Sequence, residues 1–136
     1  MAGDDEMSLM GPGMGFEMLA ASLRADAGDT LAFMEALATK LGGALPHRVR
    51  VERGGGLFSR AHPVRLIAVN LGDWEYLVNA APDGTLEAAR THAVRGIALK
   101  SEPVPLDQWI EDLSAGLAAL AQASLQDRMA LQRLLG

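Results

Sequence analysis

Residues 64–80, VRLIAVNLGDWEYLVNA, have the pattern of a β-hairpin. Two runs rich in aliphatic and aromatic residues meet at Gly72–Asp73, a pair that suits a tight type II′ turn. The turn fixes the register, and residues paired across it share a face because side chains alternate along each strand. One face of the hairpin is therefore almost wholly apolar. The predicted pairs are Leu71 with Trp74, Val69 with Tyr76, Ile67 with Val78, and Arg65 with Ala80.

The second face of this hairpin is half apolar. A strand pair that is apolar on both sides needs cover on both sides, from helices of its own chain or from another chain. We therefore expect Val64, Leu66 and Leu77 to contribute to an interaction surface. The residues of this face are Val64, Leu66, Ala68 and Leu77, together with Asn70, Glu75 and Asn79.

Two helices are predicted before the hairpin. The first follows a helical period from Phe16 to about Arg24. The second covers residues 30–41, with Asp29 as its N-cap and Gly42–Gly43 as a left-handed stop. The apolar stripe predicted for the second helix is Leu31, Met34, Leu37, Ala38 and Leu41.

The first 15 residues are rich in Met and Gly, and we expect residues 1–15 to form a flexible leader. The alternative is a docking peptide, because Met side chains adapt to apolar grooves. Residues 16–136 are expected to form a single domain, because a chain of this size can bury a substantial core.

Period-two alternation predicts a half-exposed strand over residues 47–53, followed by a glycine-rich loop that runs to Pro63. Pro82-Asp83-Gly84 is a strong turn signal. Residues 85–91 are predicted as a strand, although their composition also suits a helix. A further short strand is predicted over residues 97–102, with Gly96 as a bulge.

A long helix is predicted from Leu106 to Leu134. If unbroken it would be roughly 43 Å long and would extend beyond a domain of this size, so it should protrude, bend or pack on another subunit. Ser124 with Asp127 resembles a capping box, which indicates a kink or a new helix start. Its second half carries surplus apolar residues, which suit either core cover or a self-association or partner surface: Leu125, Met129, Leu131, Leu134 and Leu135.

The order of these elements predicts an α+β fold. We expect an antiparallel β-sheet of about four or five strands, with N-terminal helices and a long C-terminal helix packed on it. The chain has no cysteine, which excludes disulfides and thiolate chemistry and fits a cytoplasmic location. No apolar run is long enough to span a bilayer, and the acidic N-terminus does not resemble an export signal.

The sequence carries no recognisable catalytic, cofactor or metal motif. His47, His62 and His92 lack the short spacing of metal ligands. Asp73 and Glu75 lie at an exposed turn, where carboxylates keep ordinary chemistry. We therefore expect a non-catalytic protein.

Basic residues concentrate in the middle of this acidic chain, which has a net charge of −5. Arginine binds phosphate groups bidentately, so a nucleic-acid backbone or an anionic lipid headgroup is an alternative partner. The competing interpretation is a solvated sheet face whose arginines pair with acidic helices. The candidate anion-binding residues are Arg48, Arg50, Arg53, Arg60 and Arg65.

The small, acidic, cysteine-free profile looks like that of secretion-chaperone or adaptor proteins, an analogy of general class rather than of motif. The leading hypothesis is a protein-interaction module that forms a homodimer, through the second hairpin face, the C-terminal helix, or both, and binds a further protein. The alternative is an anion-binding protein, and the third hypothesis is a small-ligand carrier or enzyme.

Overall fold

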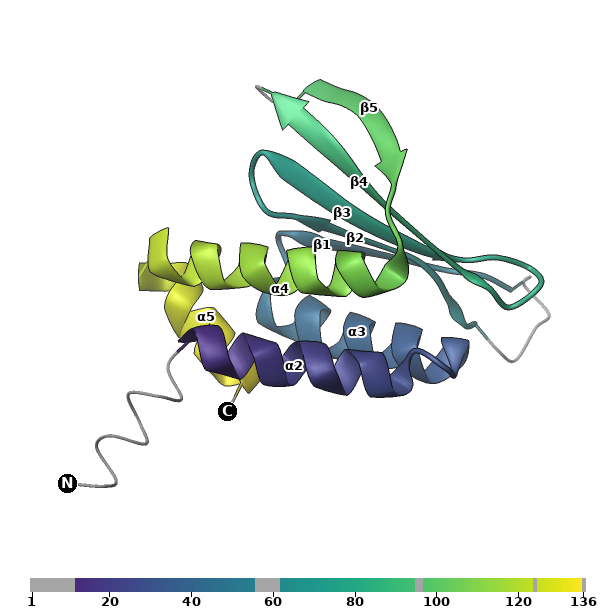
Figure 1. Ribbon diagram of the computed structural model, residues 1–136, viewed down its shortest axis with the longest axis horizontal. Coiled ribbons are helices and arrows are strands. Elements are labelled where there is room, and N and C mark those ends of the chain that lie inside the picture. Colours follow the sequence, from purple (N-terminus) through teal and green to yellow (C-terminus); the bar gives the residue numbers. More distant parts are fainter. Residues whose placement is uncertain (1–11, 56–61, 95–96, 124, 136) are drawn as a thin grey trace.

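The computed structural model describes residues 12–55, 62–94, 97–123 and 125–135. Within these ranges two helices precede a five-stranded antiparallel sheet and two follow it, which confirms the predicted α+β class (Figure 1). All four helices lie on one side of the sheet (Figure 1). The elements are α2 (Pro12–Asp26), α3 (Thr30–Ala44), β1 (Val49–Arg53), β2 (Val64–Asn70), β3 (Trp74–Ala80), β4 (Leu86–Val94), β5 (Ile97–Pro103), α4 (Leu106–Ala123) and α5 (Leu125–Leu135).

The strands form a meander in the order β1-β2-β3-β4-β5, so each strand pairs with its neighbours in sequence. The predicted register of the β2–β3 hairpin is confirmed, because Val69 pairs with Tyr76 and Ile67 with Val78. Gly72 has a φ of +96°, which is the positive angle that the first central position of a type II′ turn requires. The Leu71 N–H donates to the Trp74 carbonyl at 2.9 Å and closes the turn.

Val64 departs from its predicted place on the second face of the hairpin. In the β1–β2 ladder Glu52 pairs with Leu66 and Arg53 with Val64, so Arg65 is the extra residue of a β-bulge. A bulge re-aims the side chains next to it. Val64 consequently belongs to the core cluster and is 2% exposed, while Arg65 is exposed. Arg65, which the predicted pairing with Ala80 places on the apolar face, is likewise not part of the core.

The strand predicted over residues 85–91 is confirmed as β4, which begins at Leu86, and residues 97–102 lie in β5 as predicted. The turn before β4 is confirmed: Gly84 has a φ of +88° and its N–H donates to the Ala81 carbonyl. The proposed bulge at Gly96 lies outside the described residues. The β4–β5 ladder instead shows a register shift between Thr91 and Ala93.

The first helix, α2, begins at Pro12, four residues before the predicted start, and proline suits the first turn of a helix. Residues 1–11 of the expected leader lie outside the described residues. In α3 the predicted N-cap is confirmed, because the Asp29 carboxylate accepts a hydrogen bond from the Ala32 N–H at 3.1 Å.

Two details of the α3 prediction are wrong. The helix continues through Gly42 and Gly43 to Ala44, because the next residue, Leu45, is buried and its N–H donates to a carbonyl inside the helix. Leu31, placed on the predicted apolar stripe, is 58% exposed, and Phe33 is buried in its stead. The stripe is therefore rotated slightly from the predicted one.

In place of one long helix the structure has two, α4 and α5, which run in different directions (Figure 1), in agreement with the predicted kink or new helix start. The proposed capping residue Ser124 itself lies outside the described residues. Helix α5 folds back and contacts α2, α3 and α4 rather than protruding (Figure 1). Leu131 is 1% exposed as a result and forms part of this chain's own core.

Helix α4 is held close to the sheet by its small and aromatic residues. Trp109 is fully buried, and its indole N–H donates to the Ala89 carbonyl of β4 at 3.0 Å. A Cβ atom added at Gly116 would lie 2.7 Å from the Leu71 side chain, so only glycine allows this approach without displacing Leu71. On its other side α4 is joined to α2 by the Ser114 hydroxyl, which donates to the Phe16 carbonyl at 2.7 Å.

The position of Leu131 generates a stability prediction with a control in the same helix. We expect Leu131→Ala to lower the free energy of unfolding by about 2–5 kcal/mol, because it opens a cavity in the core. Met129→Ala, at a position that is 54% exposed, should change it by less than about 0.5 kcal/mol. Urea unfolding followed by circular dichroism measures both. Equal losses in the two variants would show that α5 does not pack as described.

The environment of Tyr76 generates a second prediction. Burial raises the pKa of the Tyr76 phenol, and the nearby Asp112 carboxylate raises it further. The folded state therefore favours the neutral phenol, and this contribution to stability is present below the ordinary tyrosine pKa of about 10 and is lost as the pH rises above it. We expect wild-type unfolding free energy to fall more steeply between about pH 9 and pH 11 than that of Tyr76→Phe. Parallel slopes in urea titrations of the two proteins would contradict this assignment.

Candidate functional site

The sheet face opposite the helices, here called the open face, carries Leu66 and Leu77 as predicted. Both side chains are half-buried, and Ala68 between them is only 4% exposed although it lies outside the core cluster. Charged neighbours border these residues, including Arg50 and Glu52, which form an ion pair at 3.2 Å. The open face is therefore less apolar at its surface than its sequence pattern indicates.

The structure places the candidate partner residues of the C-terminal helix in different environments. Met129 is exposed, whereas Leu134 and Leu135 are partly buried against the core of their own chain. Leu131 is in that core, so it is not available to a partner, and the side chain of Leu125 lies outside the described part. Most of the described apolar side chains of this helix therefore pack against their own chain.

Exposed large hydrophobic side chains gather at a different place, the end of the β4–β5 hairpin. Val94, Ile97 and Leu99 are 44%, 67% and 52% exposed. Val94 pairs with Ile97 across the hairpin, and Leu99 follows two residues later on the same strand face. Figure 1 shows this end of the hairpin standing clear of the four helices. The other exposed large hydrophobic residues of the described part are Met18, Leu31 and Met129, all on helices.

An aromatic pair connects this exposed end to the core. Trp74 pairs with His92 across β3 and β4, and their rings stack with centroids 4.6 Å apart. The Arg90 guanidinium lies 4.5 Å from the Trp74 ring, an arrangement that favours a cation–π interaction. By strand alternation these rings share a face with the three aliphatic residues. We call the set the hairpin patch: Trp74, His92, Val94, Ile97 and Leu99.

Arg90 is held at the inner border of the hairpin patch by two carboxylates. It forms an ion pair and hydrogen bond with Glu102, its partner across the β4–β5 ladder, and its guanidinium lies 3.8 Å from the Asp112 carboxylate of α4. These carboxylates offset the charge of Arg90. The hairpin patch is therefore apolar in its centre and bordered here by paired charges.

The candidate anion-binding arginines are mostly paired within the chain. Arg48 contacts Asp127 of α5 at 3.3 Å, and Arg53 contacts Glu35 of α3 at 3.0 Å. Arg50 pairs with Glu52 on its own strand. Arg65 forms no ion pair with a described residue, and Arg60 lies outside the described part. Three of the four described arginines are therefore engaged by carboxylates of their own chain.

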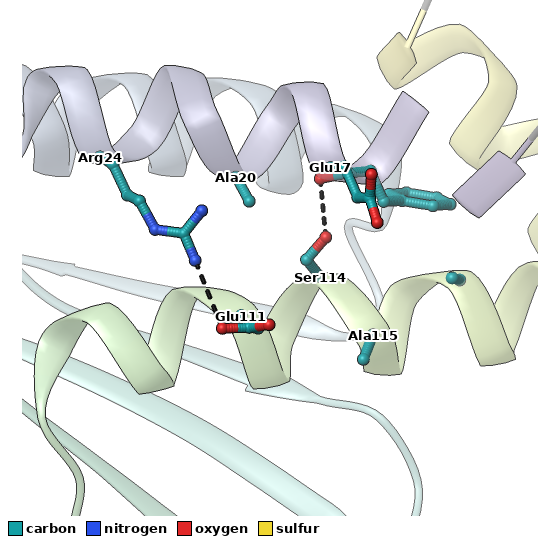
Figure 2. Close-up of a pocket in the computed structure, with 8 residues that line it drawn as sticks. Glu17, Ala20, Arg24, Glu111, Ser114 and Ala115 are labelled. Atoms are coloured by element: carbon teal, nitrogen blue, oxygen red, sulfur yellow. Dashed lines mark hydrogen bonds and ion pairs between the residues drawn. The ribbon is translucent and has the colours of Figure 1, made fainter. Parts of the chain in front are cut away.

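A groove of about 420 Å³ lies between α2 and α4, and three of its polar side chains, Arg24, Glu111 and Ser114, contact the opposite helix (Figure 2). Figure 2 shows Arg24 reaching across to Glu111, at 3.6 Å, and Ser114 reaching to the backbone of α2, where it meets the Phe16 carbonyl. Arg24 also contacts Asp107 at 3.1 Å. These contacts join the two helices, so their evident role is structural.

A second groove, of about 270 Å³, lies between α3 and α5 and is bordered by Lys40 and Arg133. Neither forms an ion pair with a described residue. Gly43 and Ala44, in the last turn of α3, line the same groove. Helix C-termini present free carbonyls and partial negative charge, which cations stabilise and anions do not. The two basic residues therefore have a structural explanation.

Within the described ranges, no cluster of three or more His, Asp or Glu side chains could hold a metal ion. His62 lies beside the Gly54 carbonyl and His92 stacks on Trp74, so these two histidines have different surroundings. None of the described helices is both long enough and apolar enough to cross a membrane.

Comparison with known proteins finds no matching family model, no matching curated protein and no matching solved structure. The functional interpretation therefore rests on the surface itself. Sequence reasoning missed the hairpin patch, although a signal was present. Ile97 and Leu99 alternate along the last strand of a meander, and the last strand of a meander lies at a sheet edge.

Proposed function

We propose that this chain is a non-catalytic protein-interaction module that self-associates through the hairpin patch. One observation carries the proposal: Val94, Ile97 and Leu99 are exposed together at the end of the β4–β5 hairpin, outside the cover of the described helices. Scattered hydrophobic residues are normal on protein surfaces, whereas contiguous ones mark interaction sites.

The chemistry of the patch favours a second copy of the chain as the partner. Its centre is aliphatic and aromatic, and its Arg90 border is already neutralised, so it offers no net charge to select a highly charged ligand. An apolar surface of this kind is matched by another apolar surface, and a twofold axis lets every residue contribute twice. The paired state of most candidate arginines gives the anion-binding alternative less support.

The size of the patch indicates a weak dimer. Burying a fully exposed Ile or Leu contributes about 1.5–3 kcal/mol, and these side chains are about half exposed. Association must first offset at least about 4 kcal/mol of lost translational and rotational freedom. We therefore expect a dissociation constant in the micromolar range, which corresponds to a binding free energy of about −8 kcal/mol, rather than a permanent complex.

Light scattering and sedimentation from roughly 1 to 100 µM test the proposal, with Ile97→Lys as the disruptive variant. We expect the wild-type mass to rise from one chain to two, and Ile97→Lys to weaken association by at least about tenfold, because it buries a charge in the patch. Leu31→Lys, at a similarly exposed position on α3, is the matched control and should associate like the wild type.

Circular dichroism and the urea midpoint should be alike in the three proteins, which separates loss of association from loss of fold. A wild-type chain that stays monomeric at about 100 µM would remove the proposal. An equal effect of Leu31→Lys would place the interface elsewhere.

A further inference from the structure

His92 is the titratable member of the hairpin patch. It lies on β4 opposite Trp74, partly buried, and the two rings stack with centroids 4.6 Å apart. The other members of the patch are Trp, Val, Ile and Leu side chains, which carry no charge at any pH. Histidine ordinarily takes up a proton near pH 6.5, between pH 5 and pH 8. The charge at the centre of the patch therefore depends on His92.

The charged groups at the inner border of the patch are already paired with one another. Arg90 lies two residues before His92 on the same face of β4, and its guanidinium is 4.5 Å from the centroid of the Trp74 ring. Its charge is offset by Glu102 of β5 and Asp112 of α4. Among the described residues, no carboxylate forms an ion pair with His92. A proton on His92 would therefore bring a second cation to the Trp74 ring without a carboxylate of its own.

The strands on either side of His92 do not supply the missing negative charge. The β4–β5 ladder has a bulge in β5, which sets both Leu99 and Lys100 opposite His92. Lys100 is exposed and stays positive throughout the pH range in which histidine titrates. On the β3 side, Asp73 lies in the exposed turn, and Glu75 is on the other strand face from Trp74. Protonated His92 would thus have a cation, rather than an acid, on its β5 side.

A dimer that uses the hairpin patch would change the surroundings of His92. A twofold axis sets the patch against a second copy of itself, so the partner brings the same uncharged side chains. Burial of a charged imidazolium among them, with no carboxylate to pair with, is unfavourable. In the free chain the exposed part of the ring stays in water and accepts a proton readily. We propose, resting on the self-association inferred above, that protonation of His92 dissociates the dimer.

Proton linkage gives the direction and the size of the effect. The dimer favours neutral His92, so association is at full strength above the ordinary titration range of histidine and is lost as the pH falls through it. Each dissociation then takes up as many as two protons, one for each copy of the chain. If the dimer excludes the proton completely, its dissociation constant rises roughly a hundredfold between about pH 8 and pH 5.5.

Other titrating groups act in the opposite direction. The chain has a net charge of −5 with its histidines neutral, and acidification lowers this negative charge. Repulsion between two copies of the chain decreases as a result, which on its own favours association. A dimer that weakens as the pH falls is therefore not explained by net charge. Measurements kept above about pH 5 also leave most carboxylates ionised.

Sedimentation at constant ionic strength, over the concentration range given above, measures the dissociation constant at about pH 8 and pH 5.5. We expect the wild-type constant to rise at least about tenfold on acidification. His92→Phe keeps an aromatic ring against Trp74 and cannot take up a proton, so its constant should change less than about twofold. His62→Gln removes an exposed histidine outside the patch and should behave like the wild type.

A second variant tests the charged state directly. His92→Lys is positive at both pH values, so at about pH 8 it should dimerise as weakly as the wild type does at pH 5.5. Circular dichroism and the urea midpoint at each pH show whether every variant remains folded. His92→Lys that dimerises as tightly as the wild type at about pH 8 would contradict the proposal.

The remaining outcomes separate this inference from the proposed function. A wild-type dimer whose dissociation constant is the same at both pH values would overturn the role of His92 and leave self-association intact. A pH dependence that persists in His92→Phe would assign the titration to another group and would also overturn it. A chain that stays monomeric at both pH values removes the proposed function and this inference together.

Discussion

The close packing of α4 on the sheet determines which parts of the sheet the helices can cover. Trp109 anchors the helix to β4 through its indole N–H, and Gly116 brings it against Leu71 at the other end. Ser114 then fixes α2 to the outer side of α4. Because α4 begins at Leu106, three residues after β5 ends, the helices gather at one end of the β4–β5 hairpin and leave the other end uncovered.

The elements governed by local chemistry could be predicted from sequence. The β2–β3 register follows from a two-residue turn, and the start of α3 follows from Asp29, because both depend on residues adjacent in the chain. The break before α5 also had a local signal in Ser124 and Asp127. The class of fold follows from the order of these elements.

What could not be predicted depends on contacts between distant segments. The bulge at Arg65 shifts Val64 into the core, and no residue in the β2 sequence predicts this bulge. The return of α5 onto α3 buries Leu131, which sequence alone leaves equally suited to a partner. Charge pairing is of the same kind: the sequence shows Arg48 and Arg53, but only the fold brings Asp127 and Glu35 to them.

The two faces of the sheet differ in their cover, because the described helices lie on one side only (Figure 1). The hairpin patch shares the strand face of Trp74, which packs against the core, so self-association through it would leave the open face of each copy untouched. The half-buried Leu66 and Leu77 would then stay accessible to other proteins. The two properties expected of an interaction module, assembly and a surface for other proteins, would thus occupy opposite faces of one sheet. The sequence alone does not separate these two surfaces, because it shows a hairpin that is apolar on both faces without showing which face the helices cover.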